Sequence, residues 1–89
     1  MRILIDKSFE KDIEKISDKH LLNLLADLIE EVRKLDQLSE IKHCKQLKGS
    51  KKAYRIRIGD YRVGFIFDNN TIIFIRFLHR SKIYGYFPD

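Results

Sequence analysis

Hydrophobic residues in the second half of the chain alternate with polar ones at the period of a β-strand. Three such segments, residues 54–58, 61–67 and 71–78, are rich in β-branched and aromatic side chains. The first two are separated by Gly59-Asp60 and the last two by an Asp-Asn-Asn sequence, both typical of tight turns. The pattern predicts an antiparallel meander of three strands. The third segment is apolar on both of its faces, which is typical of a strand inside a sheet.

The first half of the chain has a helical period instead. After a short apolar strand at residues 2–5, Phe9, Ile13 and Ile16 recur at helical spacing behind Ser8, a suitable N-cap. A second helix is predicted from about residue 18 to residue 36, because apolar residues form an i, i+3, i+4 stripe there. The short break between the two helices predicts an antiparallel hairpin, whose apolar side must be covered by the sheet.

These elements predict an α+β fold of the order β-α-α-β-β-β, with the N-terminal helix hairpin packed on one face of an antiparallel sheet. The chain has 89 residues, which is enough for one packed core, so residues 1–89 are expected to form a single domain. Residues 38–52 are expected to be a basic connector with one helical turn near residues 40–43.

The turn between the first two meander strands determines which residues face each other. A two-residue loop pairs Arg57 with Arg62 and Arg55 with Gly64, on the face opposite to the helices. Like charges in this arrangement destabilise a sheet by ~0.2–1 kcal/mol, so we expect the arginines to bind an external anion. Gly64 is expected to leave open space above Arg55 for a ligand backbone. Arg76 falls on the helix side after a regular turn, and on the arginine face if its strand contains one bulge.

Charge is distributed unevenly along the chain. Residues 1–41 carry 7 basic and 10 acidic side chains, a net charge of −3, whereas residues 42–89 carry 11 basic and 3 acidic ones, a net charge of +8. This asymmetry predicts a polyanionic partner for the second half of the chain.

Several function classes are not supported by the sequence. No apolar run is long enough to cross a bilayer, and no signal-peptide pattern is visible at the N-terminus. The single cysteine, Cys44, is expected to be a small apolar filler, and a reducing cytoplasm is the expected location. No metal-ligand spacing, serine-nucleophile motif or phosphate-binding glycine loop is visible, so no metal or cofactor is expected.

Arginine and lysine, with one histidine and two tyrosines near the sheet's end, suit metal-free cleavage of RNA. In that reaction the 2′-OH loses a proton, the charge on the phosphorane oxygens is stabilised, and the 5′ leaving oxygen gains a proton. Fixed cations stabilise the charge, and histidine, tyrosine or a lysine of lowered pKa can transfer the protons.

The same residues carry a family resemblance. Four motifs resemble, in their order, the RelE/ParE superfamily of type II toxins: Leu47-Lys48-Gly49, Tyr54-Arg55-Ile56-Arg57, Gly59-Asp60-Tyr61-Arg62-Val63 and His79-Arg80-Ser81-Lys82-Ile83-Tyr84. The order of strand, helix hairpin and antiparallel meander is similar too, so the resemblance covers nearly the whole chain. The resemblance implies a RelE-like microbial ribonuclease fold. It also implies an endoribonuclease that cleaves mRNA on the ribosome and is neutralised by a cognate acidic antitoxin protein.

By this resemblance Arg57, Arg62 and Arg80 bind and stabilise the scissile phosphate, and Tyr84 belongs to the catalytic set. RelE-type enzymes usually carry lysines on the first meander strand, one of them suggested as a base. Arginine rarely loses its proton, so the identity of the general base stays open between Tyr84, Lys52 and His79.

The other basic residues have less specific expected roles. Arg55, Lys48, Lys51 and Lys52 are expected to contact the RNA backbone. Two histidines outside the motifs, His20 and His43, are expected to be solvated, and Tyr86 is expected to pack against the core.

Two alternatives to a nuclease remain. A ParE-like toxin has a similar fold but inhibits DNA gyrase without cutting RNA, although such chains generally lack the full set of cations and the terminal tyrosine. A basic nucleic-acid-binding module without catalysis would explain the charge, but not the pairing of Arg57 with Arg62.

Overall fold

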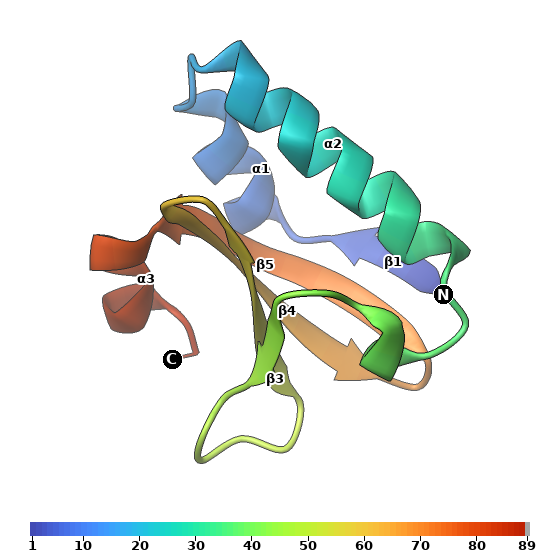
Figure 1. The fold of residues 1–89 in the computed structure, drawn as a ribbon. Coiled ribbons are helices and arrows are strands. Elements are labelled where there is room, and N and C mark those ends of the chain that lie inside the picture. Colours follow the sequence, from blue (N-terminus) through green and yellow to red (C-terminus); the bar gives the residue numbers. More distant parts are fainter. Residues whose placement is uncertain (89) are drawn as a thin grey trace.

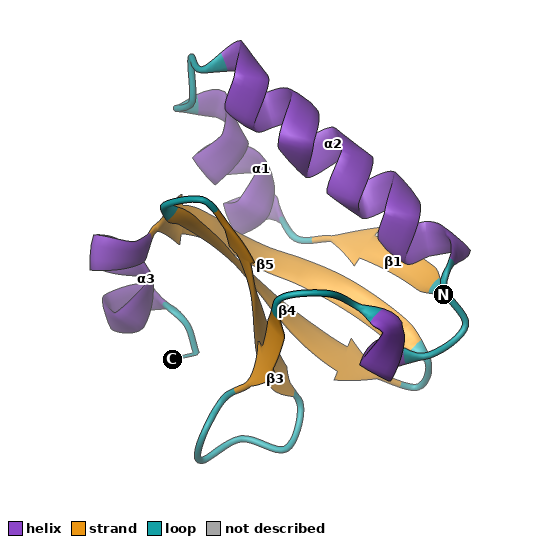
Figure 2. Ribbon diagram, viewed as in Figure 1, coloured by secondary structure: helices purple, strands orange, loops and turns teal. Residues whose placement is uncertain are grey.

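The computed structural model describes residues 1–88, which form one five-stranded sheet with helices on both of its sides (Figures 1 and 2). In chain order the elements are β1 (Arg2–Ile5), α1 (Lys7–Glu14), α2 (Lys19–Lys34), a 3₁₀ turn η1 (Leu38–Glu40), β2 (Cys44–Gln46), β3 (Ala53–Ile58), β4 (Tyr61–Asp68), β5 (Thr71–His79) and α3 (Arg80–Tyr86). The strand order is β1-β5-β4-β3-β2, in which β1 runs parallel to β5 and the other pairs are antiparallel.

The predicted α+β class and the helix hairpin on one face are confirmed, and β1 is an edge strand as expected. Two elements were missing from the prediction. The connector contains the short edge strand β2, and its helical turn lies at Leu38–Glu40 rather than at residues 40–43. The chain also ends in a third helix, α3, which lies on the other side of the sheet from the helix hairpin (Figure 1).

Aspartates begin both helices of the hairpin. Asp6, not Ser8, is the N-cap of α1, and its carboxylate accepts hydrogen bonds from the backbone N–H (3.1 Å) and the hydroxyl (2.6 Å) of Ser8. These two bonds lower the pKa of Asp6. Asp18 caps α2 by accepting a bond from the N–H of Leu21. The two carboxylates thus bind backbone N–H groups that have no acceptor inside the helix, and this stabilises the start of each helix.

The main core lies between the helix hairpin and the sheet. Phe9 of α1 and Leu25 and Val32 of α2 are at most 2 % exposed. They pack on apolar side chains of β3, β4 and β5: Ile56, Val63, Phe65, Ile72, Phe74 and Phe77. As predicted, Arg57 lies opposite Arg62 and Arg55 lies opposite Gly64. The alternate residues of β3 and β4 therefore face the helices, and the arginines face away from them.

A second, smaller core lies on the arginine side of the sheet. Ile83 and Phe87, four residues apart at the C-terminal end, pack with Leu47 and Ala53. The expectation of open space above Gly64 is wrong, because the ring of Phe87 occupies that position. Tyr86 was expected to pack against the core, but it is 54 % exposed.

A bulge in β5 settles the register of Arg76. The partner of Gly64 is Arg76 whereas the partner of Phe65 is Phe74, so Ile75 is the extra residue. Arg76 therefore has the register of the arginine face, but its guanidinium binds Asp12 of α1 at 2.8 and 2.9 Å.

The buried carboxylate of Asp12 joins α1 to β5. Besides Arg76, it accepts a hydrogen bond from the backbone N–H of Phe77, at a part of β5 that β1 does not cover. The guanidinium of Arg76 also lies 5.1 Å from the centre of the Tyr86 ring. This cluster thus links the helix hairpin, the sheet and α3 at one edge. No helix within residues 1–88 is long and apolar enough to cross a membrane.

Candidate active site

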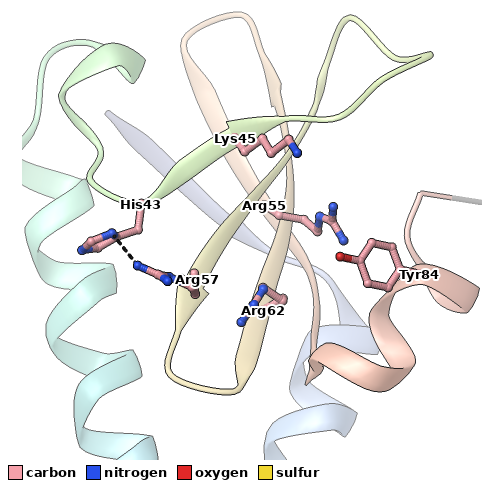
Figure 3. A pocket seen from close by; sticks show the side chains of 6 residues that line it. All are labelled: His43, Lys45, Arg55, Arg57, Arg62 and Tyr84. Atoms are coloured by element: carbon pink, nitrogen blue, oxygen red, sulfur yellow. Dashed lines mark hydrogen bonds between the residues drawn. The ribbon is translucent and has the colours of Figure 1, made fainter.

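A cleft of about 320 Å³ lies on the arginine side of the sheet beside α3 (Figure 3). Among the described residues its lining is basic and aromatic and contains no carboxylate: His43, Lys45, Arg55, Arg57, Arg62 and Tyr84. The strands β2, β3 and β4 form its floor, and α3 contributes Tyr84 from one side. The sequence predicted four of these six residues as site residues, and it missed His43 and Lys45.

The guanidinium groups of Arg57 and Arg62 contact a histidine ring and backbone carbonyl groups. Nη1 of Arg62 donates to the backbone carbonyl oxygens of Gly59 (2.9 Å) and Tyr61 (3.0 Å). Nη2 of Arg57 lies 3.3 Å from Nδ1 of His43. Because neither partner is a carboxylate, both positive charges remain uncompensated within the described lining of the cleft. A phosphate would supply the missing negative charge.

Arg55 is half-buried in the cleft and packs against Tyr84. Its Cζ atom lies 4.3 Å from the centre of the Tyr84 ring, which is a cation–π contact. Its Nη1 atom is buried and has no hydrogen-bond partner among residues 1–88. A buried donor in this state is costly, and an oxygen of a bound ligand would satisfy it.

Tyr84 is 71 % exposed, so its ring does not close the core. Figure 3 shows its hydroxyl group turned toward the arginines of the sheet. Ile83 and Phe87 anchor α3 instead and leave the tyrosine at the cleft wall.

Arg80 and His79 do not line the cleft. The Nε atom of Arg80 lies 3.9 Å from a carboxylate oxygen of Asp60, and both side chains of this pair are well exposed. His79 is the N-cap of α3, where its Nδ1 atom accepts a hydrogen bond from the N–H of Ser81. Its ring also stands edge-on to Tyr61, 5.6 Å between centres.

The three predicted RNA-binding lysines lie in the loop between β2 and β3. The ammonium group of Lys52 is 3.3 Å from Asp68. Lys48 lines a smaller pocket of about 190 Å³, which also touches Arg55, Tyr84 and Phe87. Lys51 is exposed. This loop therefore extends the basic surface outward from the cleft.

His43 and Lys45 reach the cleft because β2 pairs with β3. Lys45 lies opposite Arg55, and the backbone carbonyl of His43 accepts a hydrogen bond from the N–H of Arg57 at 3.1 Å. His43 is exposed, as expected, and its ring also contacts Arg57, which the sequence did not predict. Three residues carry too little pattern to predict a strand, so no local signal marked either side chain.

Comparisons with known proteins agree with this arrangement. A family model described as the ParE toxin of the type II toxin–antitoxin system parDE matches residues 3–84. The toxin RelE3 of Methanocaldococcus jannaschii is 40% identical to this chain over 89 residues, which are 99% of this chain and 100% of that toxin. The chain belongs to the RelE/ParE superfamily of type II toxins.

Solved structures of the superfamily have the same fold as this toxin. The RelB–RelE antitoxin–toxin complex from Methanococcus jannaschii matches with a TM-score of 0.81 and 39% identity, covering 96% of this chain and 99% of that one. The archaeal RelE–RelB complex from Pyrococcus horikoshii matches with a TM-score of 0.69 and 22% identity, over 91% and 96% of the two chains. At this lower identity the likeness shows the fold alone.

Proposed function

We propose that this toxin is an endoribonuclease that cleaves mRNA on the ribosome by attack of a 2′-OH on the adjacent phosphate. The observation that carries the proposal is the convergence of three arginines and Tyr84 on one cleft whose described lining contains no carboxylate. Mg²⁺ and Ca²⁺ in proteins are bound mainly by carboxylate and carbonyl oxygens, and the described lining has no carboxylate. Fixed guanidinium groups take over the stabilisation of negative charge, without a metal ion.

Each arginine has a role in the proposed reaction. Arg57 and Arg62, directly opposite each other on β3 and β4, bind the non-bridging oxygens of the scissile phosphate. The Nη1 atom of Arg55, which has no partner within the described part of the chain, binds one of these two oxygens as well. Charge builds up on these oxygens in the transition state, and one well-placed donor is worth about 2–4 kcal/mol there.

Tyr84 donates the proton that the 5′ leaving oxygen needs. Its exposed hydroxyl is turned into the cleft, and the nearby guanidinium of Arg55 stabilises the phenolate that remains. Solvent then returns the proton. General acid catalysis of this kind contributes roughly 10²–10⁴-fold to a rate.

RNA on either side of the cut would contact the surrounding basic residues. An exposed ion pair such as Arg80–Asp60 is weak, so a phosphate of the RNA can replace the carboxylate. Lys48, Lys51 and Lys52 extend the phosphate-binding surface. In the resting state the cognate partner is an acidic antitoxin, as the solved RelB–RelE complexes of related toxins suggest.

Inducing the toxin in a bacterium and mapping the 5′ ends of cellular mRNA tests the proposal. We expect cuts that depend on translation and that the variant Arg57→Gln abolishes. The matched control is Arg33→Gln on α2, where the arginine pairs only with exposed Glu30. Growth arrest with intact mRNA contradicts the nuclease.

Gyrase inhibition is the second candidate, because the matching family model is described as a ParE toxin. It predicts growth arrest with intact mRNA and loss of DNA supercoiling by purified gyrase when the toxin is added.

A further inference from the structure

His43 is the one imidazole among the described residues that line the cleft. Its Nδ1 atom lies 3.3 Å from Nη2 of Arg57. A guanidinium group has donors and no acceptor, so the histidine nitrogen must be the acceptor. Nδ1 therefore carries a lone pair in this arrangement and no proton.

The backbone holds this histidine in place beside Arg57. Its φ angle is 57°, in the left-handed region that few residues other than glycine adopt. The carbonyl oxygen of the same residue binds the N–H of Arg57. Residues in rare backbone conformations cluster at functional sites, where the surrounding structure holds them.

The other cleft residues are poorer proton acceptors. Arginine keeps its proton at any physiological pH, and the ordinary pKa of lysine side chains lies well above neutral pH. Lys52 and His79, which the sequence suggested as bases, lie outside the cleft lining. Imidazole is the side chain that both gains and loses a proton near neutral pH.

We propose that His43 is the general base of this toxin, and that binding of the substrate makes its Nδ1 atom accessible. This inference rests on the proposed nuclease function. A phosphate entering the cleft draws the guanidinium of Arg57 onto its oxygens, and the lone pair of Nδ1 is then exposed to the neighbouring 2′-OH.

The proton of the 2′-OH passes to Nδ1, and the 2′ oxygen forms a bond to phosphorus. The bond from phosphorus to the 5′ oxygen breaks, and that oxygen takes the proton of the Tyr84 hydroxyl. The products are a 2′,3′-cyclic phosphate and a 5′-OH. The imidazolium then releases its proton to solvent.

The rate of this step depends on pH through the imidazole, and the charged groups around the imidazole influence that dependence. Arg57 contacts it, and Lys45 of β2 and Arg62 of β4 line the same cleft. An adjoining pocket of about 140 Å³, which His43 also lines, brings three more charged groups from α2, η1 and the segment before β2: Glu31, Glu40 and Lys42.

The test is single-turnover cleavage of mRNA on programmed 70S ribosomes by the purified full-length toxin. His43→Asn is the decisive variant, because asparagine tolerates the left-handed backbone and its oxygen can accept from Arg57, but its amide cannot take up a proton. We expect its rate to fall roughly 10²–10⁴-fold. His20→Asn, on the exposed start of α2, is the matched control and should cleave at the wild-type rate.

Two readouts separate a base from a residue that only positions Arg57. The wild-type rate should rise with pH between about pH 5 and 8, and His43→Asn should lose this rise. In His43→Gly, which also suits a positive φ, added imidazole should restore cleavage. A substrate with sulfur in place of the 5′ oxygen, which leaves without an acid, should rescue Tyr84→Phe but not His43→Asn.

Wild-type cleavage with an unchanged rate in His43→Asn would overturn the inference and leave the nuclease intact. So would a slower variant that keeps the wild-type pH profile, or a His43→Gly variant that imidazole does not rescue. Absence of cleavage by the wild-type toxin on translating ribosomes would instead overturn the proposed function itself.

Discussion

Gly64 and Phe87 are in such close contact that a methyl group added at Gly64 would lie 2.5 Å from the Cδ2 atom of the phenylalanine ring. The glycine thus sets how closely α3 approaches β4, and through α3 it sets where Tyr84 stands. The space above the strand is used by the protein's own C-terminal segment.

Gly64→Ala should therefore destabilise the toxin by about 1–3 kcal/mol, because the ring of Phe87 must leave its place in the small core. Urea unfolding measures this change. Gly85→Ala is the matched control, since an added methyl group there has no neighbour within 4 Å and alanine favours a helix by up to about 1 kcal/mol. Equal stabilities of the two variants would contradict the role assigned to the contact.

Asp12→Ala should cost about 3–5 kcal/mol, the usual penalty for removing one partner of a buried ion pair. The change leaves Arg76 without its carboxylate and the N–H of Phe77 without an acceptor. The comparison is Glu30→Ala, which removes an ion pair whose side chains are 55% and 62% exposed. That change should stay within about 0.5 kcal/mol in the same unfolding experiment. A small loss in Asp12→Ala would show that the cluster is dispensable.

Cys44 should react slowly with thiol reagents in the folded toxin. Burial raises the pKa of this thiol to about 11, from an ordinary 9.0, so the reactive thiolate is scarce at pH 8. The thiol of Cys44 binds its proton more tightly in the folded state than in the unfolded state. Its contribution to the free energy of unfolding is therefore fully present below pH 9 and is lost as the pH rises toward 11. Labelling with a disulfide reagent in the absence and presence of urea measures the difference. Equal rates would contradict it.

Tyr84→Phe should lower mRNA cleavage roughly 10²–10⁴-fold while leaving stability almost unchanged. The variant keeps the ring beneath Arg55 and removes only the hydroxyl group. Single-turnover cleavage and urea unfolding of the same preparation separate the two effects. A variant that cleaves at the wild-type rate would remove Tyr84 from the proposed acid role.

The sheet register was predictable because its determinants are local. Gly59 adopts a φ of 55°, and Asn69 and Asn70 adopt 51° and 56°, values that these residue types favour in tight hairpin turns. Once a turn is fixed, the two-residue period of a strand places Arg57 opposite Arg62 without further information.

The elements that complete the cleft are determined by contacts distant in sequence. The strand β2 has three residues and exists because β3 lies beside it. The helix α3 shows only the four-residue spacing of Ile83 and Phe87 as a sign of its buried side. A glycine in a strand indicates a close approach, but it does not say whether a ligand or the chain's own ring makes that approach.

The nearly neutral helix hairpin, with 7 acidic and 6 basic side chains over residues 7–34, and the basic cleft occupy opposite sides of one sheet, so the positive charge is concentrated on one side of the toxin. The electric field of a polyanion such as RNA rotates the toxin during its approach, so that the basic cleft faces the polyanion at first contact. Encounters become fast and correctly oriented at low ionic strength, and both advantages fade as added salt shortens the range of the field to about 10 Å at 0.1 M. The uneven distribution of charge thus orients the toxin during its approach, and the cleft side supplies the positive charge.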